Sequence, residues 1–274
     1  MTRERKVLVY LILSIGIVLT MTPFLWMISN SFKDTSEIFS YPPTLWPQVP
    51  IVTNYIRLFT ALRVSFGRNL FNSTVVAIVT TLATLLLSAL GGFAFSKYEF
   101  KGKRMLFYIL LGSMMLPFQA IVVPLYILMV RFGWVDNYRA LIIPFVASPL
   151  GTFLMRQYMV TIPSAVIDAA RVDGCSEFRI FAQIALPLSK PALGSLTIVT
   201  FMNSWNSFLW PLIVLSTDRL LTMPVALNNF VYLYQAEYGL VMAGATLAAA
   251  PVIAIFIRLQ KYFVSGLTLG ATKL

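Results

Sequence analysis

The sequence contains no histidine and only one cysteine, Cys175. A chain without histidine has no imidazole to act as a general base, and a single cysteine cannot form a disulfide within the chain. Histidine catalysis, a thiolate–imidazole metal cluster and an internal disulfide are therefore excluded. Charge is also scarce, since 11% of the residues are charged and 58% are hydrophobic. The mean hydropathy of +0.81 lies outside the range of soluble domains.

Several motifs of energy-converting proteins are missing as well. No Gly-x-x-x-x-Gly-Lys-[Ser/Thr] segment occurs, and Gly102-Lys103 is followed by Arg104 in a basic loop, so the chain lacks a nucleotide-binding loop of its own. Its long uncharged runs hold no carboxylate for a proton relay, which argues against an ion-coupled transporter. No nucleophile–base pair is visible. We expect no enzyme activity, no cofactor and no metal site.

What the sequence does contain is a series of long runs without Asp, Glu, Lys or Arg. A membrane-spanning helix needs roughly 20 apolar residues, and about 17 to 25 are tolerated. Five of the six runs meet this length, and the fourth can be extended by Arg156, which can snorkel to the interface. The runs predict an all-α polytopic membrane protein with six transmembrane helices. They cover residues 7–32, 69–96, 105–130, 140–155, 191–217 and 238–257.

The net charge of +11 is informative through the distribution of Lys and Arg along the predicted membrane topology. Cytoplasmic loops of membrane proteins carry an excess of Lys and Arg. Placing the N-terminus in the cytoplasm puts 14 of the 21 Lys and Arg residues on the inner side. This orientation predicts that both termini and the 157–190 loop, between the fourth and fifth helices, are cytoplasmic. The basic charge then needs no nucleic-acid partner.

The segment 162–191 is a polar interruption in this apolar chain. Ser164 and Ser176 are suitable N-caps, and Gly174 can end a helix in the left-handed conformation. The pattern predicts two short helices joined by a glycine elbow, with Pro187 and Pro191 closing the second. An ordinary amphipathic hairpin that caps the bundle explains this pattern equally well.

Asp168-Ala169-Ala170, then Asp173-Gly174, Phe181, Ile184 and Leu186-Pro187, resembles the "EAA" loop of ATP-binding-cassette (ABC) importer permeases. The match has many points, although Asp168 stands where the family usually has Glu. In that family, separate ATPase subunits dock on this loop. The resemblance therefore implies a coupling surface for ATPase subunits. Its residues would be Asp168, Ala169, Ala170, Asp173, Gly174, Phe178 and Phe181.

The fifth run has the most polar interior. Asn203, Trp205, Asn206 and Trp210 bring amide and indole groups to a depth at which they need partners or water. Aromatic faces beside amides also suit a sugar, and the arrangement resembles the carbohydrate branch of the family. We expect these four residues to border a translocation path, with helix–helix hydrogen bonding as the alternative.

The tail, residues 265–273, is similar to the ending of maltose- and glycerol-phosphate-type permeases, with Thr272 in place of the usual Val. In that family the tail reaches between the ATPase subunits. Contact with a partner is therefore implied for Gly266, Thr268, Gly270 and Lys273.

The resemblance implies a permease subunit of the binding-protein-dependent (MetI-like) superfamily in a bacterial or archaeal inner membrane. Its implied partners are two ABC ATPase subunits or an ATPase homodimer, a second homologous permease, an extracytoplasmic solute-binding protein and membrane lipid. The expected divisions are 1–68 (first helix and outer loop), 69–263 (transmembrane core) and 264–274 (cytoplasmic tail). A channel or facilitator, and a membrane scaffold that moves no solute, remain open alternatives.

Overall fold

The computed structural model describes residues 3–60, 65–233 and 237–268. Within these ranges the chain is helical and has no strand. In chain order the elements are α1 (Arg3–Ser31), α2 (Thr35–Ile38), α3 (Thr53–Thr60), α4 (Phe66–Lys97), α5 (Lys103–Ser113), α6 (Phe118–Arg131), α7 (Tyr138–Val146), α8 (Pro149–Val160), α9 (Ser164–Val172), α10 (Glu177–Ile180), the π-helix η1 (Phe181–Ala185), α11 (Leu186–Leu188), α12 (Lys190–Trp205), α13 (Leu209–Val214), α14 (Met223–Leu233) and α15 (Tyr238–Thr268).

Six candidate membrane spans lie in the described part of the chain. Four of them are long and apolar enough without a sharp break: α1, α4, the α7–α8 pair and α15. Two more are bent pairs, α5 with α6 at 100° and α10–α11 with α12 at 78°. Each of the six uncharged runs overlaps one of these spans, and the fifth extends beyond α12 into α13 (Leu209–Val214). The predicted all-α membrane fold is confirmed.

Proline explains the sharpest bend. Pro117 is the N-cap of α6, and the chain turns by 100° between Ser113 and Phe118. A proline lacks an N–H and disfavours helical geometry at the residue before it, so a helix cannot run through Leu116 and Pro117. Pro124, by contrast, lies inside α6. The third run is therefore two helices and not one.

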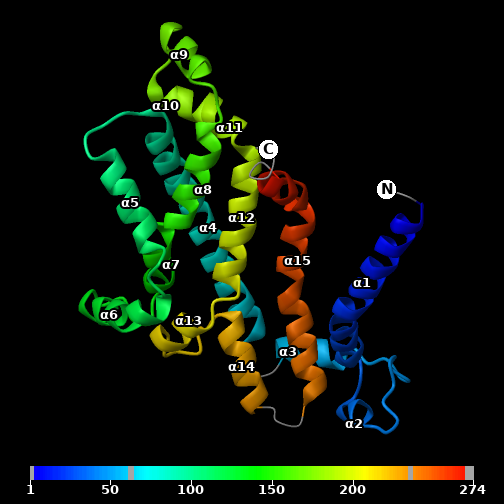
Figure 1. The fold of residues 1–274 in the computed structure, drawn as a ribbon. Helices are drawn as coiled ribbons and strands as arrows, with labels where there is room; N and C mark the ends of the chain where they lie inside the picture. Colours follow the sequence, from blue (N-terminus) through cyan, green and yellow to red (C-terminus); the bar gives the residue numbers. More distant parts are fainter. Residues whose placement is uncertain (1–2, 61–64, 234–236, 269–274) are drawn as a thin grey trace. The chain divides into compact units, whose positions relative to one another are not determined.

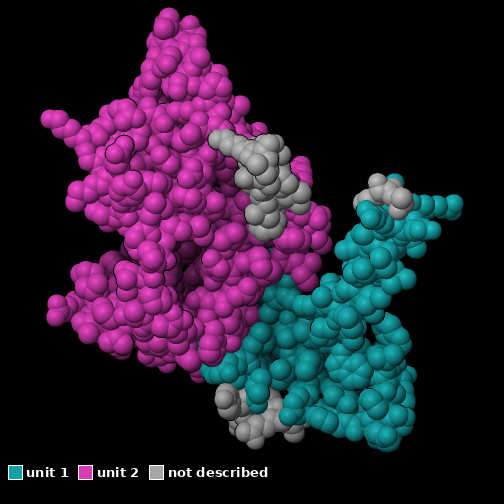
Figure 2. Space-filling view, viewed as in Figure 1, with its two compact units in different colours: residues 1–70, 225–251 teal, residues 71–224, 252–274 magenta. Residues whose placement is uncertain are grey.

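The chain forms two compact units, residues 1–70 with 225–251 and residues 71–224 with 252–274 (Figure 2). In the first, the loop that follows α1 is tied to it by a buried amide. The Asn54 side chain donates to the carbonyl oxygens of Ser31 and Lys33, both at 3.0 Å. This loop is therefore folded back on its own unit.

The second unit is organised by close contact between α4 and α8. A Cβ placed on Gly92 would meet the Cβ of Met155 at 2.5 Å and the backbone nitrogen of Arg156 at 2.8 Å. A similar Cβ on Gly151 would meet Ser88 Oγ at 2.3 Å. Small residues thus let two backbones touch, as is common between transmembrane helices. In Figure 1, α4, α8 and α12 run together toward the end that carries α9 and α10.

Candidate functional site

The segment α9–α10 is the polar interruption identified in the sequence, and a glycine shapes it. Gly174 has φ +78°, the left-handed conformation that glycine adopts without a Cβ clash. The N–H of Cys175 donates to the Ala170 carbonyl and the N–H of Gly174 to the Arg171 carbonyl, both at 3.0 Å. These two bonds form a Schellman motif, which satisfies the last carbonyls of α9. The predicted glycine elbow is confirmed.

The two helices of this segment, α9 and α10, begin with different caps. Ser176 is the N-cap of α10, and its Oγ accepts from the N–H of Arg179 at 3.4 Å, as predicted. The prediction for Ser164 is wrong, because Ser164 is the first residue of α9 and Pro163 occupies the cap without a side-chain bond. Proline holds an extended conformation there and defines the helix start through its backbone.

The expected end of the second helix is also wrong. The chain continues from α10 through η1 into α11, and Pro187 lies within α11. In the π-turn the N–H of Leu186 reaches back five residues to the Phe181 carbonyl. This register shift accommodates a residue that has no N–H. The direction changes at Ser189, between α11 and α12.

One face of α9–α10 packs into the core of the second unit. Ile167, Ala170, Ile180 and Phe181 are buried in a cluster that includes Met155 of α8. Because Ala170 is 7% exposed and Phe181 is 4% exposed, neither presents a surface to another molecule. The structure places these two predicted coupling residues inside the chain's own core.

The opposite face is exposed and apolar. Val172 is 87% exposed and Phe178 is 74% exposed, although both are large hydrophobic residues. Ala169, Asp173 and Gly174 lie exposed beside them. We call Ala169, Val172, Asp173, Gly174 and Phe178 the outer face. An exposed apolar patch rimmed by polar groups is typical of a protein-binding surface. Val172 was not predicted as a surface residue. It follows Ala169 by three residues, which places both on one face of a helix and could have indicated it.

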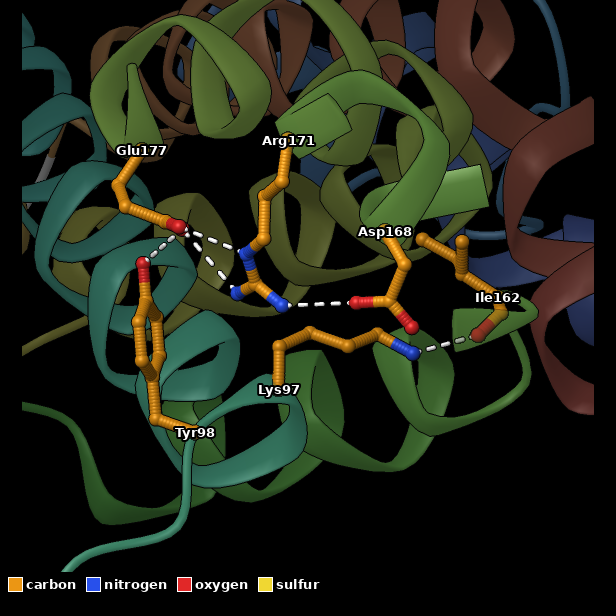
Figure 3. Close-up of polar contacts among 6 residues, drawn as sticks. All are labelled: Lys97, Tyr98, Ile162, Asp168, Arg171 and Glu177. Atoms are coloured by element: carbon orange, nitrogen blue, oxygen red, sulfur yellow. Dashed lines mark hydrogen bonds and ion pairs between the residues drawn. The ribbon is translucent and has the colours of Figure 1, made fainter. Parts of the chain in front are cut away.

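A polar network holds α9 to α10 and to the end of α4 (Figure 3). Arg171 donates to Asp168 Oδ1 at 2.9 Å, and to Glu177 Oε1 at 2.7 Å and Oε2 at 3.3 Å. The Tyr98 hydroxyl donates to Glu177 Oε2. Burial and this bond to Glu177 raise the pKa of Tyr98, while the hydrogen bonds to Glu177 hold the pKa of Arg171 above its ordinary value. The network therefore stays charged and intact at neutral pH.

Asp168 is part of this network and is not a free charge. Its carboxylate pairs with Arg171, and the Lys97 side chain lies alongside it while donating to the Ile162 carbonyl (Figure 3). Glutamate, which the family usually has at this position, is one carbon longer, so its carboxylate would extend farther from α9. Within this chain, Asp168 therefore holds the Arg171 side chain in position.

A cavity of about 810 Å³ lies in the second unit, beside the C-terminal half of α12. Its described lining contains no Asp, Glu, Lys or Arg. Thr80 and Thr222 line it, and their hydroxyls are buried without a hydrogen-bond partner among the described residues. Asn203, Ser204 and Ser207 add further neutral polar groups. The cavity is thus a mixed polar and apolar site without charge.

Three aromatic rings form part of its wall. Phe118, Phe145 and Trp210 lie 6.0 to 6.2 Å apart, centroid to centroid, in tilted and edge-to-face pairs. The Trp210 indole N–H donates to the Ala140 carbonyl at 2.9 Å, which fixes the ring. Trp210 itself is 2% exposed, so it supports the rings of Phe118 and Phe145, and these two partly exposed rings offer a rigid apolar face inside the cavity.

The four predicted path residues separate in the structure. Asn203 and Trp210 line the cavity. Trp205 is 3% exposed and stacks on Phe201, with centroids 5.5 Å apart, while Asn206 is the exposed C-cap of α12. Neither is among the cavity's lining residues. The fifth run divides because α12 ends at Trp205 and α13 begins at Leu209.

The predicted tail residues lie at or beyond the end of the description. Gly266 and Thr268 belong to the last turns of α15. Gly270 and Lys273 lie outside the described residues.

Comparison with known proteins now decides the family. Residues 87–269 match the family described as "Binding-protein-dependent transport system inner membrane component". This match covers α9–α10, all of α8, the last turns of α4 and most of the residues that line the cavity. The chain belongs to this family. It is a multi-pass inner-membrane permease subunit of an ABC importer.

Curated relatives resemble the permease over nearly its whole length. The arabinooligosaccharides transport system permease protein AraQ of Bacillus subtilis is 40% identical over 253 residues, covering 92% of this chain and 90% of the relative. The lactose transport system permease protein LacG of Rhizobium radiobacter is 33% identical and covers 96% and 95%. The sn-glycerol-3-phosphate transport system permease protein UgpE of Rhizobium meliloti is 33% identical and covers 94% of each.

Solved structures show the same fold. A bacterial ABC transporter involved in the import of the acidic polysaccharide alginate contains a chain that matches this permease with a TM-score of 0.83. The match covers 96% of this chain and 99% of that chain, at 22% identity.

Proposed function

We propose that the permease forms half of a translocation path for an uncharged sugar or short oligosaccharide, and that the cavity in its second unit contacts the solute. The observation that carries this proposal is the lining, which combines the partly exposed rings of Phe118 and Phe145, backed by Trp210, with Thr, Ser and Asn side chains. It has no ionisable group among its described residues. Sugars offer apolar C–H faces to aromatic rings and hydroxyls to neutral polar groups. Ligand sites are mostly apolar with a few placed polar groups, as here.

The lining also discriminates between the substrates that the relatives' names mention. Arabinooligosaccharides and lactose are neutral, whereas sn-glycerol-3-phosphate and alginate are anionic. An anion that enters a low-dielectric cavity needs a cationic or a strong donor group to offset its desolvation. The described lining provides neither Lys nor Arg, so it favours the neutral solutes.

The energy for transport comes, in this proposal, from ATPase subunits that dock on α9–α10. The outer face supplies an apolar contact surface, and the Arg171 network transmits its displacement to α4 through Tyr98. The orientation that the basic residues favour places α9–α10 and both termini in the cytoplasm. Gly266, Thr268, Gly270 and Lys273 then belong to a tail that contacts the same ATPases.

Two further partners complete the proposed complex. A second homologous permease supplies the other half of the path, and an extracytoplasmic solute-binding protein delivers the sugar. A solved alginate ABC transporter forms a complex with a periplasmic protein that carries an alginate pentasaccharide, which is the same kind of assembly.

A transport assay tests the cavity. The complete complex, reconstituted with its binding protein, is supplied with arabinooligosaccharide, lactose or sn-glycerol-3-phosphate, each with and without ATP. Asn203→Ala removes a cavity amide, and Asn206→Ala removes an exposed amide three residues away that does not line the cavity. We expect ATP-dependent uptake of a neutral sugar. Asn203→Ala should slow it about fivefold or more, the cost of one lost hydrogen bond, and Asn206→Ala should leave it unchanged.

The opposite results have clear meanings. Equal loss in both variants, or loss only in Asn206→Ala, contradicts the assignment of the path to this cavity. Preferred uptake of sn-glycerol-3-phosphate contradicts the proposal that the transported solute is uncharged. Uptake that is equally fast without ATP indicates a facilitator.

A further inference from the structure

A second hollow in the same unit is separate from the proposed path. It is a groove of about 1110 Å³ at the end of α4, the start of α5 and the end of α8. Phe95 and Phe107 form its wall, and Lys103, Arg104 and Arg156 lie along it. None of these residues lines the sugar cavity. The groove therefore needs an explanation of its own.

Arg156 is built into the wall. Its guanidinium lies over the Phe107 ring, 4.2 Å from the centroid, and its Nε donates to the Phe95 carbonyl at 3.4 Å. No carboxylate pairs with it in the described ranges 3–60, 65–233 and 237–268. A fixed guanidinium on an aromatic wall presents its remaining N–H groups as donors to an anion.

The other charges leave a positive excess. Lys103 is already paired with Glu99 at 2.8 Å and donates to the Tyr98 carbonyl at 2.7 Å. Arg104 is exposed and, like Arg156, has no carboxylate partner within the part of the chain described. Two arginines and one neutralised lysine therefore line the groove. Arginine is well suited to phosphate, because its planar fork can make two parallel hydrogen bonds.

The remainder of the groove is apolar and open. Along α5, Met105 is 67% exposed, Tyr108 is 63% exposed and Ile109 is 56% exposed, and all three line the groove. The basic end lies where α4 ends at Lys97 and α5 begins at Lys103, so it sits at the boundary of two membrane spans. A phosphate there has hydrocarbon directly beneath it, which suits a lipid better than a soluble anion.

We propose that this groove binds an anionic phospholipid, with its phosphate at Arg104 and Arg156 and an acyl chain along the exposed face of α5. Basic pockets between spans at a membrane surface bind acidic headgroups, and each Lys or Arg near the surface strengthens the attraction. The lipid would cover exposed aromatic and aliphatic side chains that no described part of the chain covers.

Lipid retention tests this proposal without reference to transport. The full chain, isolated with its assembly partners from nanodiscs that contain phosphatidylcholine and phosphatidylglycerol, is analysed by native mass spectrometry for bound lipid. We expect phosphatidylglycerol to be retained over phosphatidylcholine. Arg104→Gln, at an exposed position, should weaken retention about fivefold, and adding Arg156→Gln should weaken it about fivefold again.

Three controls make the test decisive. Lys101→Gln removes the same charge three residues away, in the turn before α5, but lies outside the groove. Its retention should fall much less than that of Arg104→Gln, and a loss as large as that of Arg104→Gln would overturn the proposal. Arg156→Lys keeps the charge and should retain most of the lipid, which separates charge from packing. Competition by inorganic phosphate as effective as that by phosphatidylglycerol vesicles would mean that the acyl chain plays no part, and would also overturn it.

Discussion

Arg171 and Glu177 form a two-point ion pair across the glycine turn, with Nε–Oε1 at 2.7 Å and Nη2–Oε2 at 3.3 Å. The pair closes the loop between α9 and α10, and the Tyr98 hydroxyl extends it to the end of α4. The neighbouring helices α9 and α10 are thereby fixed to each other and to the end of α4, which is distant in sequence. In the proposed function, this arrangement lets a push on the outer face move α4 instead of merely bending a loop.

Arg171→Gln should uncouple this arrangement with little loss of stability. The pair is partly exposed, with the Arg171 side chain at 35% and Glu177 at 46%, so its loss should cost less than about 1 kcal/mol in unfolding free energy. We expect faster hydrogen exchange in α9–α10 and more ATP consumed for each solute moved, at a nearly unchanged melting temperature. The matched control is Arg179→Gln, since the Arg179 side chain donates to Gln183 within its own segment and pairs with no carboxylate among the described residues. An equal effect of both variants would remove the special role of Arg171.

Val172→Glu should prevent the ATPase from docking. Val172 is 87% exposed, so the new carboxylate stays solvated in the isolated chain and the fold should tolerate it. A charge buried without a partner at an interface costs several kcal/mol, so at least a hundredfold weaker association is expected. Co-purification of the ATPase and substrate-stimulated hydrolysis measure the effect. Lys101→Glu, at an exposed position outside α9–α10, should co-purify normally, and full assembly of the Val172→Glu variant would refute the outer face as the docking surface.

Gly174→Ala should strain the elbow through the backbone alone. Nothing lies within 4 Å of a Cβ built at this position, whereas its φ of +78° is unfavourable for alanine by about 1–2 kcal/mol. Gly174→Asn should cost less, because asparagine tolerates the left-handed region. Denaturant titration of the detergent-solubilised chain, with hydrogen exchange to locate the change, gives the order glycine, asparagine, alanine from most to least stable. Equal stability of alanine and glycine would show that the elbow carries no strain.

The sequence predicted the elements of the fold better than their bends. Uncharged runs located all six candidate spans, because a charge in hydrocarbon is costly over any length. The 100° bend and the passage of Pro187 through η1 depend on neighbouring backbone geometry, which composition does not encode. The presence of Pro117 explains why a helix is interrupted there but does not determine the angle of the bend.

The candidate site was also predicted in part. The elbow follows from the local pattern, and the resemblance to the EAA loop indicated Ala169 and Phe178 as contact residues. The bond between Tyr98 and Glu177 joins residues 79 positions apart, and no spacing rule indicates it. Ala170 and Phe181 belong to the same motif as Ala169, yet their side chains pack into the core. A helical segment at the surface buries one face and exposes the other, and one motif contributes residues to both faces.

Asp136 should make the stability of the second unit depend on pH in the acid range. Its Oδ1 accepts from the backbone N–H groups of Ser216 and Thr217 at 3.0 and 3.1 Å, and its own N–H donates to the Val214 carbonyl. Burial raises the pKa of Asp136, but these hydrogen bonds lower it more, so the net shift is downward. A lowered native pKa contributes stability that is fully present above the unfolded value of about 3.9 and is lost as the pH falls through the native pKa.

Melting temperatures measured between neutral and strongly acidic pH should therefore fall more steeply below about pH 4 in the unmodified chain than in Asp136→Asn. Asparagine keeps an acceptor oxygen and tolerates the φ of +56° at this position, so the variant should still fold. Asp218→Asn is the control, because it removes a nearby carboxylate that lies exposed. Parallel pH profiles for all three proteins would contradict the prediction.

Gly92→Ala should separate α4 from α8 and destabilise the whole second unit. The added Cβ would lie 2.5 Å from Met155 Cβ and 2.8 Å from the Arg156 nitrogen, and the latter is backbone that cannot turn aside. Overpacking of this kind costs about 1–3 kcal/mol or more, so the melting temperature should fall by several degrees. Gly112→Ala is the matched control: Gly112 also lies in a helix, but nothing stands within 4 Å of its Cβ position, so its melting temperature should hold or rise. Because α9–α10 packs on the same cluster as Met155, Gly92→Ala should also loosen the outer face, and hydrogen exchange there should rise in this variant alone.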